Sequence, residues 1–126
     1  MTTWLCLAAG GVLGTFARYG LSQAAFKTLG PSFPYGTFAV NLIGSFLVGS
    51  FAEFAGHRMS LGPQARIFLM TGFCGAFTTF SAVMLESSQM MHAGHPARAF
   101  LYIIASVAAG LLLFQAGVRV ADVVMS

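Results

Sequence analysis

Charged side chains are scarce in this sequence. Of its 126 residues, only 7% are Asp, Glu, Lys or Arg, whereas 57% are hydrophobic. An ordinary soluble domain carries about 25% charged residues. So few charges cannot cover a water-soluble fold of this size, and we expect the chain to lie in a lipid bilayer.

Acidic residues are the rarest charged group. The three acids, Glu53, Glu86 and Asp122, are separated from one another by more than thirty residues. No nucleophile with a neighbouring base, no cluster of metal ligands and no phosphate-binding loop accompanies them. The sequence therefore predicts that the protein is not an enzyme. The six cations form no basic patch, so we expect no nucleic-acid partner either.

Cysteine is also rare. Cys6 and Cys74 lie in different apolar segments, and no Cys-x-x-Cys pair or Cys/His cluster is present. This pattern argues against a disulfide or a structural metal and favours two buried apolar thiols.

No basic residue precedes Arg18, so we interpret the first apolar segment as a retained helix and not as a signal peptide.

Long apolar segments fill most of the chain. They cover about residues 3–25, 35–55, 63–91 and 97–124, with turn-forming residues at 30–34, 56–58 and 93–96. A helix needs roughly 20 apolar residues to cross a bilayer. The predicted fold is therefore an all-α membrane protein, with residues 1–126 forming one domain of four transmembrane helices.

The cations are distributed almost evenly between the two ends of such a bundle. One side carries Lys27 and Arg98, with Arg18 added if the first helix ends near it, and the other carries Arg58, Arg66 and Arg119. Orientation normally follows an excess of Lys and Arg on the cytoplasmic side. Without that excess, the chain is expected to insert both ways. Alternatively, the short loops carry few charges and an insertion partner or a single Arg decides.

Glycine is abundant, with 15 residues. Small residues four apart allow membrane helices to pack closely. Such pairs are Gly10 and Gly14, Ser45 and Gly49, and Ser106 and Gly110. Each pair is either an internal packing surface or a dimer seam. One bundle of four helices leaves little room for a pore, so transport would require an oligomer. The balanced cations and the lack of an internal repeat favour an antiparallel dimer.

Polar residues recur at helical spacing within the apolar segments. Two triplets have a spacing of four residues: Thr37, Asn41 and Ser45, and Tyr102, Ser106 and Gly110. Residues four apart share one helix face. An isolated hydroxyl in such a helix commonly bonds to a neighbouring helix. Two matching tracks without charge favour instead a polar path lined by both.

The third segment contains a stretch with low helix propensity at 71–81, where two glycines are followed by two threonines and a serine. A break in the helix is one interpretation, and its freed carbonyls could then coordinate a cation. The other is an intact helix whose glycines admit a neighbouring helix.

Three segments resemble the Fluc (CrcB-type) fluoride channel family. They are the Gly-rich segment 10–19, the Tyr-Gly-Thr-Phe-Ala-Val-Asn-Leu segment 35–42, and the segment 71–81 together with Glu86. The fourth helix matches only loosely. The resemblance implies a passive fluoride channel assembled as an antiparallel homodimer with two pores, in the inner or plasma membrane of a bacterial cell.

The resemblance also implies roles for individual residues. The backbone carbonyls of Gly75 and Thr78 would bind a central structural sodium ion at the dimer interface. The other residues would serve fluoride: Asn41 and Thr37 as pore-lining donors, Phe80 as a pore aromatic, Arg18 in the vestibule, and Ser81, Tyr102 and Ser106 as the polar track. Phenyl ring edges carry partial positive charge and can stabilise an anion without holding it tightly.

The sequence departs from the family pattern after Phe80. Val83 stands where a second pore aromatic is expected, and Met84 stands where a serine is expected. The departure would lower throughput, change selectivity, or require a heterodimeric partner that supplies the missing ring. Two other functions compete: a small multidrug-resistance-type proton-coupled transporter, which needs an acid on the first helix, and an assembly protein that transports nothing.

Overall fold

The computed structural model describes residues 1–56 and 61–126. The described residues are helical and contain no strand. The elements are α1 (Thr2–Leu29), α2 (Tyr35–Gly56), α3 (Pro63–Arg66), the π-helix η1 (Ile67–Cys74), α4 (Gly75–Phe77), α5 (Phe80–His92) and α6 (Pro96–Met125). The all-helical prediction is confirmed. The turn predicted at 56–58 falls, beyond Gly56, outside the described residues, and so does Arg58.

Three described segments are long and apolar enough to cross a membrane: Tyr35–Gly56, Pro63–His92 and Pro96–Met125. By this measure the chain is a multi-pass membrane protein. Helix α1 has 28 residues, which exceeds the roughly 20 needed for a crossing, but it is not among these three. It continues to Leu29, so Arg18 lies within the helix and not in the connection that follows it.

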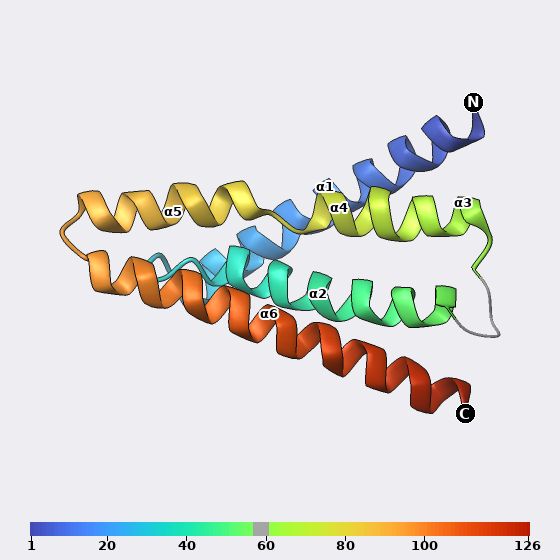
Figure 1. Ribbon diagram of the computed structural model, residues 1–126. Coiled ribbons are helices and arrows are strands. Elements are labelled where there is room, and N and C mark those ends of the chain that lie inside the picture. The colour runs from blue at the N-terminus through green and yellow to red at the C-terminus, as the bar shows by residue number, and fades with distance from the viewer. Residues whose placement is uncertain (57–60) are drawn as a thin grey trace.

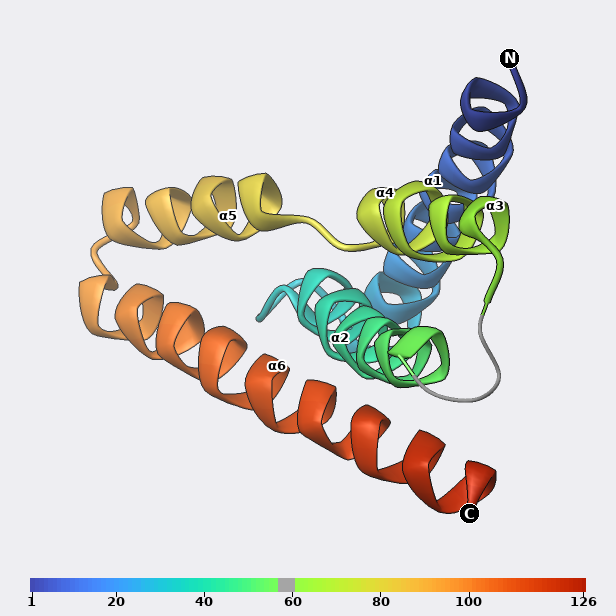
Figure 2. The ribbon, with the colours of Figure 1, turned by 45° about the vertical axis from the view of Figure 1, so that its right-hand side comes forward.

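The helices pack as two pairs, α2 with α6 and α1 with the third segment. Helices α2 and α6 run side by side in the same direction and form the most extensive contact, while α1 crosses the α3–η1–α4 rod (Figures 1 and 2). Helices α5 and α6 form a hairpin at one end, and the N- and C-termini both lie toward the other end (Figure 1).

Glycines allow two of these contacts to be made backbone to backbone. A Cβ on Gly117 would overlap the carbonyl oxygen of Phe46 on α2, and one on Gly49 would overlap that of Phe114 on α6. The hydroxyl of Ser50 donates to the carbonyl of Gly117 at 3.1 Å across the same seam. Gly49 therefore serves packing within the chain.

The pair on α1 serves the same purpose. A Cβ on Gly10 would overlap the carbonyl oxygen of Phe68, and one on Gly14 would overlap that of Phe73, both in η1. For Gly10 and Gly14, internal packing is thus the correct interpretation of the glycine spacing.

The third segment is broken between α4 and α5. Thr78 (φ −85°, ψ 157°) and Thr79 (φ −151°, ψ 116°) are extended, so the predicted interruption is confirmed. It lies at the two threonines, because Gly72 and Gly75 are both helical. The Thr78 hydroxyl donates to the Cys74 carbonyl at 2.9 Å, and the Thr79 hydroxyl accepts from the Ala82 amide at 3.2 Å, which caps α5.

The eight residues before α4 form the π-helix η1, which the sequence did not predict. Stretches of π-helix are rare and usually limited to single turns. This one lies against Gly10 and Gly14 of α1 and ends at Cys74, one short helix (α4) before the break. The wide helix thus brings the α1 contact and the break into one region.

Candidate functional site

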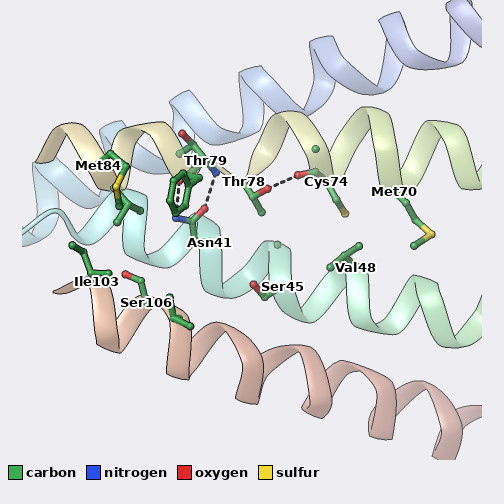
Figure 3. A pocket seen from close by; sticks show the side chains of 15 residues that line it. Asn41, Ser45, Val48, Met70, Cys74, Thr78, Thr79, Met84, Ile103 and Ser106 are labelled. Carbon is green, nitrogen blue, oxygen red and sulfur yellow. Dashed lines mark hydrogen bonds between the residues drawn. The ribbon is translucent and has the colours of Figure 1, made fainter. Parts of the chain in front are cut away.

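Asn41 of α2 holds the broken backbone of the third segment. Its side-chain nitrogen donates to the Thr79 carbonyl at 3.0 Å, and its side-chain oxygen accepts from the Thr79 amide at 2.7 Å (Figure 3). The extended backbone at Thr79 is therefore paired with another helix. Buried backbone groups need such partners in lipid.

Side-chain acceptors at the break take the hydrogen bonds that two carbonyls would receive in a continuous helix. The Gly75 carbonyl would accept from the Thr79 amide, which donates to Asn41 instead. The Thr78 carbonyl would accept from the Ala82 amide, which donates to the Thr79 hydroxyl. Both carbonyls lose their regular α-helical donor. They are the carbonyls predicted to bind sodium, and hard cations prefer oxygen ligands.

A cavity of about 390 Å³ lies beside the break. Figure 3 shows that side chains of α2, the third segment and α6 converge on it. None of its lining residues is charged. Asn41, Ser45 and Ser106 supply polar groups, and the Ser106 oxygen is buried without a hydrogen-bond partner. The cavity therefore offers uncharged donors in an apolar wall.

Phe80 and Val83 occupy different environments in this cavity wall. The Phe80 side chain is 74% exposed, whereas Val83 is 4% exposed and packs within the chain. Met84 lines the same wall. The two positions that depart from the family pattern, Val83 and Met84, thus both border the cavity.

The carboxylate of Glu86 joins the two polar tracks. The Thr37 hydroxyl donates to one oxygen of Glu86 at 2.5 Å, and the Tyr102 hydroxyl donates to the other at 2.6 Å. Thr37 and Tyr102 are both buried. Glu86 was not among the predicted site residues, although an acid within a membrane segment is itself a signal of function.

The tracks also meet further along α2 and α6. Asn41 and Ser106 line one cavity, and a Cβ on Gly110 would lie 3.4 Å from the Ser45 hydroxyl. The structure therefore brings the two predicted triplets together pairwise. Their first members bind Glu86, and the middle pair borders the uncharged cavity.

Two smaller cavities share Glu86 in their walls. One of about 230 Å³ has the polar residues Ser22, Gln23 and Thr37 in its lining. The other, of about 360 Å³, lies at the α5–α6 hairpin and includes His95 and Arg98. Both also contain Phe26, Phe33 and Pro34, so they adjoin each other.

Three predicted site residues line none of these cavities: Tyr102, which bonds to Glu86, and Ser81 and Arg18. Ser81 is exposed, and its hydroxyl lies 3.3 Å from that of Thr79. Arg18 is half-buried on α1. Their predicted roles in fluoride permeation, Ser81 in the polar track and Arg18 in the vestibule, stay predictions.

Comparison with known proteins gives a consistent assignment. Residues 5–118 match the model of a family described as CrcB-like protein, Camphor Resistance (CrcB). The chain is 46% identical to the fluoride-specific ion channel FluC of Chlorobaculum tepidum, over 96% of this chain and 95% of that protein. It is 44% identical to the protein of the same name from Chlorobium luteolum (90% and 88% covered) and 42% identical to that from Rhizobium meliloti (90% and 90%). The chain therefore belongs to the CrcB-like family.

Proposed function

We propose that this protein is a passive, fluoride-selective ion channel that exports cytoplasmic fluoride. Family membership and relatives named fluoride-specific ion channels support this function. The observation in the structure that carries it is the uncharged cavity at the helix break, where the Ser106 hydroxyl is buried without a partner. An unpaired donor of this kind is available to an anion that has shed water.

The residues that line the cavity suit the permeation of fluoride better than its tight binding. Fluoride must receive hydrogen bonds to replace its hydration, and Ser106, Ser45 and Asn41 each carry donors. The exposed ring of Phe80 adds a positive edge. A full positive charge in the wall would hold the anion and slow its exit, and none lines this cavity.

The proposed assembly is an antiparallel homodimer with two pores. The single chain leaves Phe80 74% exposed at the cavity, and a second, inverted copy would cover this ring. The described helices carry a similar number of cations toward the two ends of the bundle, with Lys27 and Arg98 against Arg66 and Arg119. Such a balance favours insertion in both orientations.

We also propose that α1 is the fourth transmembrane helix. Several of its large apolar side chains point outward: Trp4, Leu13 and Phe16 are 73%, 52% and 71% exposed. An apolar surface of this extent on a helix requires lipid or a partner to cover it. We place the protein in the inner or plasma membrane of a bacterial cell.

A structural sodium ion at the dimer interface completes the proposal. The Gly75 and Thr78 carbonyls have lost their regular helical donors, and each copy would contribute this pair. The ion would offset the partial negative charge of carbonyls that face each other. Sodium is not required to move with fluoride in this scheme.

The small multidrug-type transporter is the alternative of another class. Its mechanism needs a membrane-embedded acid on the first helix, and no acid precedes Glu53 in this chain. The acid of the third segment, Glu86, is held by two hydroxyls. The sequence therefore favours the channel.

Efflux from liposomes that contain the purified chain tests the proposal. We expect rapid release of fluoride, little release of chloride, and loss of fluoride release when sodium is removed. Phe80→Ile should slow fluoride release about tenfold or more, equivalent to about 1.4 kcal/mol of barrier. The control is Phe100→Ile, because Phe100 is an exposed ring on α6 outside the three cavities.

Each of these three measurements has a result that would contradict one part of the proposal. Folded wild-type protein that releases no fluoride would refute the channel function. Sodium-independent release would refute only the proposed ion, and equal effects of the Phe80 and Phe100 substitutions would remove Phe80 from the path.

A further inference from the structure

The cavity at the α5–α6 hairpin contains a cation in its wall. It has a volume of about 360 Å³ and lies between the 31–34 turn, α5 and the start of α6. Figure 1 shows this turn beside the first turns of α6. Arg98 lines this cavity, whereas Arg18 and Lys27 line none of the three cavities described above.

Arg98 forms no ion pair with an acid in the described part of the chain. The Glu86 carboxylate lines the same cavity but receives its hydrogen bonds from Thr37 and Tyr102. The Arg98 guanidinium donates to the Ser32 carbonyl. A guanidinium has five N–H donors, so this single bond leaves donors for a further ligand.

The position of Arg98 does not serve helix stability. It lies in the first turn of α6, which contains no acid. The helix dipole places partial positive charge there, so a cation at this position is unfavourable. At the first turn of α6, the dipole of this helix and the guanidinium act in the same sense on an anion.

We infer that Arg98 draws small anions into this cavity, which forms a loading vestibule next to the Glu86 network. The inference deepens the proposed function and rests on it. A cavity wall of low dielectric focuses the field of a charge and raises the local concentration of the counter-ion. Fluoride would collect there before it reaches the uncharged cavity.

The test compares fluoride efflux from liposomes at low and high ionic strength, set with an impermeant salt at constant fluoride. The variants are Arg98→Gln, Arg98→Lys and the control Lys27→Gln, which removes an exposed cation in the last turn of α1. The Debye length falls from about 30 Å at 0.01 M to about 3 Å at 1 M salt.

We expect Arg98→Gln to slow efflux about threefold to tenfold at low ionic strength and to match wild type at high ionic strength. Arg98→Lys should stay near the wild-type rate, because it keeps the charge. Lys27→Gln should not differ from wild type.

Two results would overturn the inference. One is an Arg98→Gln variant that matches wild type at low ionic strength. The other is equal slowing by Arg98→Gln and Arg98→Lys at every salt concentration, because Arg98 would then only position the turn through Ser32. The proposed function fails separately, if the wild-type protein itself releases no fluoride.

Discussion

Asn41 performs two tasks with one side chain. It supplies both hydrogen-bond partners of Thr79, at 3.0 and 2.7 Å, where the third segment leaves helical geometry. It also lines the uncharged cavity. A primary amide has two donor hydrogens, and the bond to Thr79 uses one of them. The residue that holds the break is thus also placed to contact an ion.

Asn41→Ala is therefore expected to reduce both stability and flux. The substitution leaves a buried amide and carbonyl of Thr79 without partners, which costs about 1–3 kcal/mol. The matched control is Ser45→Ala, because Ser45 lines the same cavity without bonding to the break. Thermal unfolding in detergent measures the difference. Equal melting temperatures for the two variants would contradict the assigned role.

The residues of the polar tracks could be predicted from the sequence, but their partners could not. A spacing of four residues in an apolar helix identified Thr37, Asn41 and Ser106. The bond from Thr37 to Glu86 joins residues 49 positions apart, and no local pattern encodes it. The bond from Asn41 to the Thr79 backbone was also missed, because the sequence does not reveal which polar groups a break leaves unpaired.

At the scale of the elements, α1 and η1 form a contact that depends on glycine. A Cβ on Gly14 would overlap the carbonyl of Phe73, whereas a Cβ on Gly11 of the same helix would meet no atom within 4 Å. The two glycines differ in surroundings and share a helical backbone. They therefore form a matched pair for substitution.

Gly14→Ala should destabilise the fold, because the added methyl forces α1 away from η1. Gly11→Ala should be neutral or stabilising by up to about 1 kcal/mol, because alanine favours helix more than glycine does. Resistance to heat and to protease in detergent measures both effects. A Gly14→Ala variant as resistant as Gly11→Ala would show that the contact is not close in solution.

The break could be predicted from local propensity, but its position and the π-helix could not. Glycine lowers helix propensity in general, yet Gly72 and Gly75 are both helical. Gly72 packs closely against Gly10 of α1. The break falls at Thr78 and Thr79. The Thr79 hydroxyl replaces a backbone acceptor for the Ala82 amide. The Thr78 hydroxyl adds a second bond to the Cys74 carbonyl, which also accepts from the Thr78 amide. The hydrogen-bond register of η1 has no signature in a pattern of apolar residues.

At the scale of the whole molecule, the balance of cations is the feature that bears on orientation. The proposed antiparallel dimer requires both orientations in one membrane. The hairpin end of each copy would then lie beside the terminal end of its partner. Added charge at one end should disturb this arrangement.

A pair of lysines at either end should fix the orientation. Thr28→Lys with Met91→Lys adds charge at the hairpin end, and Thr2→Lys with Ser126→Lys adds it at the terminal end; all four side chains are exposed. Each double variant alone should yield little fluoride efflux. Co-expression of the two should restore it. Full activity of either double variant alone would exclude an obligate inverted pair.

The location of the two chain ends restricts how copies can be joined genetically. Both termini lie toward the same end of the molecule (Figure 1). In an inverted pair, the C-terminus of one copy and the N-terminus of the other would emerge on opposite faces of the membrane. A soluble peptide linker therefore cannot fuse two such copies in tandem, and the connecting segment must itself cross the bilayer once.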